Sequence, residues 1–372
     1  MINKTPRKEK IMKNTITKII TLALAVLMLF SFAACNTTNN DEGSASSSGT
    51  ETSGTSSNND KVSVALDLTK EWEAVNGKNT LVQGCLVVNT KFAEEHPAEV
   101  AQFLKDYEAS VNFISAGSDE AIAMITDEKI KILPNANIAK KALPNCNICF
   151  IDGMDMKPLM TTFCEKLHDY NEKSVSAVPN DDFYYVSDAD ASAADKDLEI
   201  KVYALNGTTA LGMAQMISKS NDGTDTMNYN FSLHASADAI TGAVVSGECA
   251  IAALPTNAAA NLFNKTGGKI KLLAINTLGV LYVLQRGDNG VEKLADLKGE
   301  TIYLPGAGTN PEFITAALVE SAGLEIGKDI YLDTTSYTSP DELQAAVIAG
   351  KVKFAVLPEP KVTVTIIQSA AK

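Results

Sequence analysis

The chain has 372 residues, of which 45% are hydrophobic and 21% are charged, so it is neither disordered throughout nor a polytopic membrane protein. At ~100–200 residues per domain, this length predicts two domains. The formal net charge of −13 argues against nucleic acid and anionic lipid surfaces as partners.

The first 35 residues have the pattern of a secretory signal peptide. Six basic side chains precede an apolar run from Ile19 to Phe30, and four mostly small residues then lead to Cys35. The run is shorter than the ~20 residues of a spanning helix, and small residues before a cysteine resemble a lipoprotein signal. We expect lipidation at Cys35, with an uncut signal anchor as the alternative.

Residues 36–60 consist almost entirely of Ser, Thr, Gly, Asn and acidic residues. Such a segment has too little apolar surface to fold, so it predicts a flexible spacer. Without the leader the chain keeps 26 basic and 44 acidic residues, a formal charge of −18. A tether and a spacer together predict a folded, extracytoplasmic body.

Cysteine usage in the body points to no metal or cofactor. Five cysteines follow Cys35, and an odd number cannot all pair within one chain. Cys146 and Cys149 form a lone C-x-x-C, without a second pair at metal-binding spacing, and the three histidines are scattered. We favour buried or surface thiols over a zinc or redox site.

The second half of the body contains an internal repeat. Residues 236–255 align without gaps with residues 339–358. In both copies a serine precedes a helical pattern, Gly247 or Gly350 ends it, and an apolar strand runs into Leu-Pro. A capping box begins at Ser339. Each copy is therefore expected to form one helix–strand unit of an α/β sheet.

A strand and a loop precede each copy of the repeat. The first pair is 200–205 with the loop 206–209, and the second is 301–304 with the loop 306–309. We expect Asn310 to cap the helix that follows, because a proline stands at the next position. Two matched lobes of alternating strands and helices are the result.

In such sheets ligands bind beyond the carboxyl ends of the strands, where loops and helix amino termini present backbone N–H groups. Gly306-x-Gly308 lacks the third glycine of a dinucleotide fingerprint and the Lys-Ser/Thr of a P-loop, so by itself it resembles a tight turn. Glu359 could equally be an exposed turn carboxylate. The candidate ligand contacts in a cleft between lobes are Asn206, Gly207, Thr208, Thr209, Thr256, Asn257, Gly306, Gly308, Thr309 and Glu359.

Two long segments of the body carry motifs of one protein family. They are Asn-Gly-Thr-Thr at 206–209, Ala-Leu-Pro-Thr-Asn at 253–257, Ile-Asn-Thr-Leu-Gly at 275–279, Asp-Leu-Lys-Gly-Glu-Thr-Ile-Tyr at 296–303, Leu-Pro-Glu-Pro at 357–360, Val-Ala-Leu-Asp-Leu-Thr-Lys-Glu-Trp at 64–72 and an amphipathic helix after Pro97. With these motifs the chain resembles the substrate-binding proteins of nitrate, sulfonate and thiamine-precursor ABC importers, the NMT1/THI5-like group.

The order of the two segments differs from that family. There, the segment resembling 200–368 comes first and the one resembling 61–185 follows, so this chain looks circularly permuted. Residues 187–198 are hydrophilic and could span up to ~40 Å when extended. Permutation is tolerated when the old termini are close and the new ones fall in exposed loops.

The resemblance implies an α/β, periplasmic-binding-protein-like fold of type II, with two lobes that are each a mixed sheet flanked by helices, joined by a two-strand hinge. One lobe would combine 81–186 with 200–282, and 187–199 would be a linker. The other would combine 61–80 with 283–372. The implied function is capture of a small solute by lobe closure and delivery to ABC permease subunits, without catalysis.

The hinge crossovers would lie near residues 72–82 and 278–286, and Trp72 and Gly84 join the candidate ligand contacts. Arg286, beside a turn signal, is the single arginine after the leader. Pockets for sulfonate or carboxylate usually use a guanidinium fork, so the sequence favours a neutral or cationic solute, such as an aminopyrimidine thiamine precursor. Helix amino termini could still bind an anion.

Two other functions remain open. Eukaryotic relatives in the group synthesise the thiamine pyrimidine, but this sequence has neither their cysteine-rich motif nor a Ser-His-Asp or Cys-His set. The other alternative is a sensory or adhesive lipoprotein that uses the same fold without transport.

Overall fold

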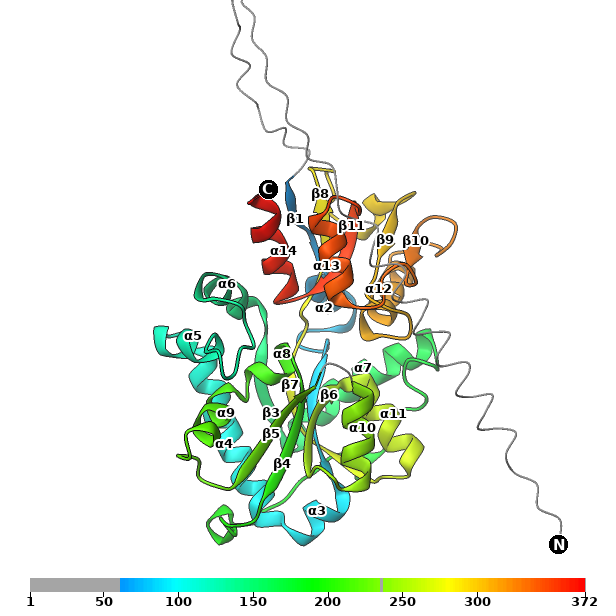
Figure 1. The fold of residues 1–372 in the computed structure, drawn as a ribbon. Coiled ribbons are helices and arrows are strands. Elements are labelled where there is room, and N and C mark those ends of the chain that lie inside the picture. Colours follow the sequence, from blue (N-terminus) through cyan, green and yellow to red (C-terminus); the bar gives the residue numbers. More distant parts are fainter. Residues whose placement is uncertain (1–60, 235–236, 372) are drawn as a thin grey trace, which may run out of the picture. The chain divides into compact units, whose positions relative to one another are not determined.

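The structure is a computed structural model that describes residues 61–234 and 237–371. Within these residues the chain forms two mixed β-sheets flanked by helices (Figure 1), which confirms the predicted α/β class. Cys35, the leader and the spacer lie outside the described residues.

The five-stranded sheet has the strand order β1-β8-β11-β9-β10. β8 runs antiparallel to β1 and β11, whereas β11, β9 and β10 run parallel to one another. The strands are β1 (Val62–Asp67), β8 (Leu281–Arg286), β9 (Thr301–Tyr303), β10 (Tyr331–Asp333) and β11 (Phe354–Pro358).

The six-stranded sheet has the order β3-β7-β2-β6-β4-β5. β7 is antiparallel to β3 and β2, β2 is antiparallel to β6, and β6, β4 and β5 are parallel. Without β3, this sheet repeats the order and directions of the other. The strands are β2 (Gly84–Asn89), β3 (Ile148–Asp152), β4 (Ile200–Leu205), β5 (Tyr229–His234), β6 (Ile251–Pro255) and β7 (Ile270–Thr277).

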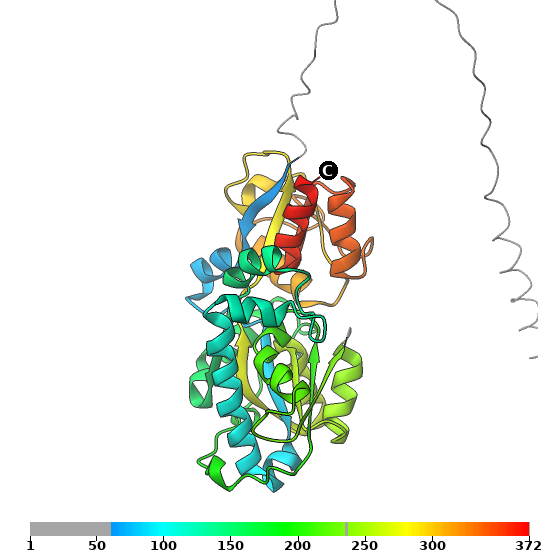
Figure 2. The same ribbon diagram turned by 60° about the vertical axis from the view of Figure 1, so that its left-hand side comes forward.

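Helices cover both faces of each sheet (Figure 2). The six-stranded sheet carries α4 (Pro97–Ser115), α5 (Asp119–Ile125), α6 (Ala136–Ala142) and α9 (Ala214–Asn221) on one face, and α7 (Met156–Tyr170), α10 (Ala237–Ser246) and α11 (Thr256–Thr266) on the other. The five-stranded sheet carries α13 (Pro340–Ile348) and α14 (Lys361–Ala370) on one face, and α2 (Leu68–Asn76) and α12 (Asn310–Ser321) on the other.

The remaining helical segments are short. They are α3 (Thr90–Glu95), α8 (Thr208–Leu211), η2 (Leu143–Asn145), η3 (Gly153–Asp155), η4 (Asp181–Phe183), η5 (Ala191–Ala193) and η6 (Leu294–Leu297). The predicted amphipathic helix is α4, and its apolar side chains Val100, Phe103, Tyr107 and Val111 pack in the core. Across the described ranges, no helix combines the length and apolar character that a bilayer crossing requires.

The apolar core is continuous between the sheets on the side of α2, α7 and α12. One cluster of buried side chains contains Val87 and Leu254 from the six-stranded sheet together with Val283 and Phe354 from the five-stranded sheet. Full burial of such a side chain stabilises a fold by ~1.5–3 kcal/mol. The two sheets are therefore held together by packing as well as by the chain itself.

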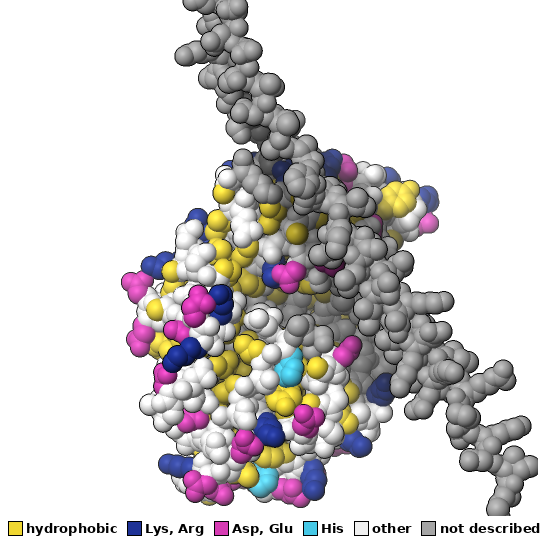
Figure 3. Space-filling view, in the orientation of Figure 1, with side chains coloured by type: hydrophobic (Ala, Val, Ile, Leu, Met, Phe, Trp, Pro, Cys, Tyr) yellow, Lys and Arg dark blue, Asp and Glu magenta, His cyan; other side chains and the backbone are white. Residues whose placement is uncertain are grey.

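Charged side chains contribute little to this stability. On the face drawn in Figure 3, acidic and basic side chains are interspersed. The side chains of the Lys131–Glu128 pair are 58% and 83% exposed, and such pairs are worth ~0–1 kcal/mol.

The internal repeat is confirmed as a structural repeat. Its first copy forms α10 and β6, and its second forms α13 and β11. Ile251 in β6 pairs with Val202 in β4, and its repeat equivalent Phe354 in β11 pairs with Ile302 in β9. Both helices end at glycines with positive φ, 81° at Gly247 and 75° at Gly350, as the sequence predicted.

Two predicted helix caps are placed differently. The prediction that Asn310 caps α12 was wrong, because Asn310 is already helical and Thr309 is the cap. At α13, Ser339 Oγ accepts from Glu342 N at 3.3 Å as predicted, but the Glu342 carboxylate accepts from Thr338 N at 2.7 Å. The return bond of the capping box is therefore shifted by one residue.

Residues 187–199 lie against α4. The turn η5 contacts α4, Ala191 is buried, and Asp195 N donates to the buried Glu99 Oε1 at 2.9 Å. The segment is thus held by specific contacts on the six-stranded side. The circularly permuted order and the division of the chain into two domains stay predictions.

Within the described residues the chain passes between the sheets twice. The first crossing, residues 77–83, leads from α2 to β2, and the second crossing, residues 278–280, leads from β7 to β8. They run side by side, because Val280 N in the second crossing donates to Gln83 Oε1 in the first at 2.6 Å. This arrangement matches the predicted two-strand hinge.

Candidate functional site

The four predicted loops follow the carboxyl ends of parallel strands. β4 and β6 are parallel neighbours, so residues 206–209 and 256–257 lie at one edge of the six-stranded sheet. The prediction of loops there was only partly right, because residues 208–209 begin α8 and residues 256–257 begin α11. β9 and β11 are also parallel neighbours, so the loops 306–309 and 359–360 lie at one edge of the five-stranded sheet. This is the edge at which ligands of α/β sheets bind.

Gly84, at the start of β2, lies where three segments approach closely. A Cβ atom at Gly84 would stand 2.6 Å from Asn276 Oδ1 and 3.0 Å from Thr209 Cγ2. Asn276, which is 1% exposed, also donates from Nδ2 to Thr209 O at 3.4 Å. Gly84 and Thr209 are therefore brought together, and only a residue without a side chain fits between them.

Thr256 holds the first crossing. Its hydroxyl donates to Val82 O at 2.5 Å, and its backbone N–H donates to Gln83 O at 3.3 Å. Because Thr256 is fully buried and so engaged, its hydroxyl is structural. The next residue, Asn257, is 8% exposed and makes no side-chain hydrogen bond among the described residues, so its amide is available for a ligand.

Glu359 is a buried carboxylate at the end of β11. It is 3% exposed, which makes the alternative of an exposed turn carboxylate wrong. Its oxygens accept from Thr363 N at 3.2 Å and Thr363 Oγ1 at 2.8 Å. Burial nevertheless raises the pKa of Glu359 to about 7, because those two bonds offset only part of the lost hydration.

The surroundings of Glu359 are acidic. Tyr282 on β8 lies between Asp67 and β11; burial, then the charges of Asp67 and Glu359, raise its pKa. Burial and the charge of Glu359 also raise the pKa of Cys146. Lys361 pairs with Asp341 instead, and Glu359 is in no ion pair among the described residues. A ligand that donates N–H groups would offset the burial of this carboxylate.

The other two loops are bonded mainly within themselves. Thr309 Oγ1 donates to Gly306 O at 2.9 Å, and Gly308 N donates to the Glu312 carboxylate. The glycines of these loops have positive φ: 93° at Gly306, 74° at Gly308 and 141° at Gly207. Asn206 is exposed and Thr208 is half-buried. Among the described residues, no side chain of 206–208 or 306–309 is hydrogen-bonded to either crossing.

Trp72 lies in the core rather than at the strand ends. It is 1% exposed, its ring centroid is 5.9 Å from that of Phe163, and Nε1 donates to Thr80 Oγ1 at 3.0 Å. Trp72 also lines a cavity of about 320 Å³, together with Tyr170 and Glu320. Its buried surface and its one donor are therefore already engaged in packing.

The sequence did not single out several polar residues at the crossings. Gln83 and Asn276 are 9% and 1% exposed; Gln83 stands inside an otherwise apolar run, and Asn276 directly follows the apolar run 272–275. Asn147, just before β3, donates from Nδ2 to Gly279 O at 2.5 Å. A lone amide within or directly after an apolar run is the signal that could have found the first two, because a buried polar group needs a partner.

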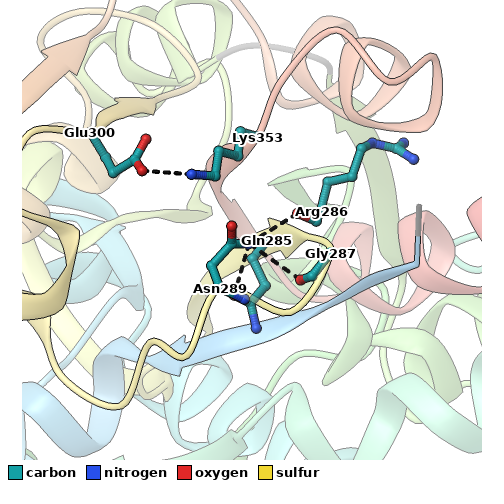
Figure 4. Close-up of polar contacts among 6 residues, drawn as sticks. All are labelled: Gln285, Arg286, Gly287, Asn289, Glu300 and Lys353. Carbon is teal, nitrogen blue, oxygen red and sulfur yellow. Dashed lines mark hydrogen bonds and ion pairs between the residues drawn. The ribbon is translucent and has the colours of Figure 1, made fainter. Parts of the chain in front are cut away.

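Arg286 serves another part of the fold, and Figure 4 shows its guanidinium group turned away from Asn289, Glu300 and Lys353. Its Nη2 donates to Val347 O at 2.5 Å, in the last turn of α13, where a cation is favoured. The predicted turn follows it, with Asn289 Nδ2 donating to Arg286 O at 3.0 Å. The neighbouring Lys353 pairs with Glu300 at 2.6 Å. The one arginine of the body is thus engaged at a helix end.

The thiols are poor nucleophiles. Cys85, Cys146, Cys149, Cys164 and Cys249 are free, and burial raises the pKa of each. A thiol, unlike a thiolate, reacts slowly. In residues 61–234 and 237–371, no group of three or more His, Cys, Asp or Glu side chains is placed to hold a metal ion.

No known family model matches the chain, and no curated protein does so either. The similar solved structures include two that match over part of their length. An ABC transporter from Parabacteroides distasonis is 22% identical, with a TM-score of 0.32, over 47% of this chain and 56% of that one. The alkanesulfonate-binding protein SsuA from Xanthomonas axonopodis pv. citri, bound to MOPS, is 16% identical, with a TM-score of 0.29, over 45% of this chain and 56% of that one. The matches span just over half of each relative, and the fold assignment rests on the two sheets themselves.

Proposed function

We propose that this protein captures a small solute between its two sheets and passes it to the permease subunits of an ABC importer. The observation that carries this is the pair of matched sheets, which share strand order and directions once β3 is left out. Within the described residues the chain passes between them only twice, at two adjacent crossings. Loops at strand ends on both sides can then close on a ligand, as in hinge-bending binding proteins.

Three observations favour a neutral or cationic solute with N–H donors over sulfonate or nitrate. Glu359 is buried without an ion pair among the described residues, and Asn257 has a free amide. Arg286, the single arginine of the body, is engaged at α13. An aminopyrimidine related to a thiamine precursor carries both N–H donors and ring-nitrogen acceptors. It could donate to the Glu359 carboxylate and pair with the Asn257 side-chain amide. The resemblance to the NMT1/THI5-like group, in permuted order, is compatible with such a solute, because that group includes binding proteins for thiamine precursors.

The same proposal includes extracytoplasmic location through a lipid on Cys35, and a purely binding role. The sequence supports the anchor by a signal peptide and a spacer that precede the folded body. The absence of catalysis is supported by thiols whose pKa burial raises and by the engagement of Thr256 in the crossing.

A thermal-shift screen of residues 58–372 tests this function. The panel holds aminopyrimidine thiamine precursors, thiamine, polyamines, taurine, alkylsulfonates and nitrate. A solute at 100 times its Kd should add ~2.7 kcal/mol and raise the Tm by several degrees. We expect an N–H donor to respond, and Asn257→Ala to lose the response with little change in the Tm of the free protein.

Response to nitrate or alkylsulfonates alone would overturn the proposed solute class. A cooperative melt with no responder would favour a lipoprotein without a transport role.

A further inference from the structure

The two crossings are held by the residues that directly follow the two copies of the repeat. Thr256 comes immediately after β6 and Glu359 immediately after β11. Thr256 N donates to Gln83 O in the first crossing at 3.3 Å, and Glu359 N donates to Val280 O in the second at 2.9 Å. Each sheet therefore holds one crossing through its strand-end loop.

In addition to its bond with Glu359, the backbone of the second crossing is hydrogen-bonded to Asn147 on the six-stranded side. Leu278 N donates to Asn147 O at 3.0 Å, and Gly279 O accepts from Asn147 Nδ2 at 2.5 Å. Gly279 also packs tightly on the first crossing and on α2, since a Cβ there would lie 2.8 Å from Leu81 Cδ2 and closer still to Thr69 Oγ1. The second crossing is thus fixed by hydrogen bonds and by close packing against its neighbours.

Gln83 is the one side chain that joins the two crossings by a hydrogen bond among the described residues. Its Oε1 accepts from the buried Val280 N at 2.6 Å, across 197 positions of sequence. Its own backbone is fixed by Thr256 and by Thr277 O. Gln83 is 9% exposed, so water does not readily replace the side-chain oxygen as the partner of Val280 N.

We infer that Gln83 is a positioning residue for solute capture: its carboxamide oxygen locks the second crossing to the first, so that both crossings move as one pivot. The role in solute capture rests on the proposed function. The hydrogen bond between the two crossings exists in the protein without solute, so it can be tested without a solute. The role requires an acceptor at this position and nothing more.

Two variants of nearly equal size distinguish the effect of the hydrogen-bond acceptor at position 83 from the effect of side-chain packing. Gln83→Met removes the oxygen, whereas Gln83→Glu keeps one. Hydrogen exchange of the full chain, purified in detergent, reports the Val280 amide directly. We expect exchange at Val280 to be roughly 10-fold faster or more in Gln83→Met, and close to the unaltered protein in Gln83→Glu. The amide of Val283, within β8, is the internal control and should not change in either variant.

The pivot is measured by the distance between two spin labels. Val186 on the six-stranded side and Tyr331 on β10 are 59% and 48% exposed and can be replaced by cysteine. The described native thiols have raised pKa values, so brief labelling favours the introduced ones. We expect a broader distance distribution in Gln83→Met than in Gln83→Glu.

Equal Val280 exchange and equal distance distributions in the two variants would overturn the inference. So would faster exchange at Val283, which would show general loss of structure. A failed solute screen would leave these results unchanged, so the two failures are distinguishable.

Discussion

Replacement of Trp72 by alanine is expected to lower the free energy of unfolding by ~3–5 kcal/mol, the usual cost of removing a large buried aromatic side chain. Trp72 is 1% exposed and packs against Phe163 of α7 within the core cluster that spans both sheets. The lost packing therefore falls between α2 and α7, where the two sheets are joined. Denaturant unfolding followed by circular dichroism measures the change, because Trp72 is the only tryptophan.

Trp72→Phe separates packing from the hydrogen bond. It keeps most of the buried ring but leaves Thr80 Oγ1 without its donor, so a loss of ~1–2 kcal/mol is expected. Equal stability of Trp72→Ala and the unaltered protein would contradict the account of the core. If Trp72→Ala kept its stability and lost solute binding, Trp72 would be a ligand contact after all.

Replacement of Glu359 by glutamine is expected to remove a fall in stability between pH ~4.5 and ~7. Burial raises the pKa of Glu359 from 4.5 to about 7 in the folded protein. Below its unfolded pKa the carboxyl is protonated in both states. As the pH rises through the folded pKa, the folded state must ionise a buried group, and ~3 kcal/mol of stability is lost.

Glutamine keeps an oxygen that can accept from Thr363 but cannot ionise. Denaturant unfolding of residues 58–372 from pH 5 to 8 should therefore show a shallower decline in Glu359→Gln than in the unaltered protein. The matched control is Glu342→Gln. Hydrogen bonds from Thr338 lower the pKa of Glu342. Glu342→Gln should therefore show the same decline in stability between pH 5 and 8 as the unaltered protein. Parallel profiles for Glu359→Gln and the unaltered protein would contradict the burial of an unpaired carboxyl.

The local structure of the repeat could be predicted from sequence. Helical spacing, the terminal glycines Gly247 and Gly350, and the apolar strands into Leu-Pro depend on residues a few positions apart. The two copies of the repeat join different sheets, and this depends on pairing between strands that are far apart in the sequence. The cap of α12 was misplaced by one residue, because both Thr309 and Asn310 suit a cap and backbone geometry selects between them.

The candidate site was predictable in part. Asn257 and Glu359 were singled out by position after repeated strands, and both are buried there. The sequence could not show that Thr256 is engaged by the first crossing or that Gln83 meets Val280, because each contact joins segments far apart in the chain. Trp72 illustrates a general limit, since an aromatic residue in an amphipathic pattern suits a core as well as a ligand site.

The central claim, solute capture by closure of two matched sheets, is tested most directly by the distance between spin labels at positions 186 and 331 in residues 58–372. The measurement is made without solute and with the strongest responder of the thermal-shift panel at saturation. We predict a shift of the mean distance and a narrower distribution when solute is bound, because closure selects one arrangement of the two sheets. An unchanged distribution at saturating solute would contradict capture by closure.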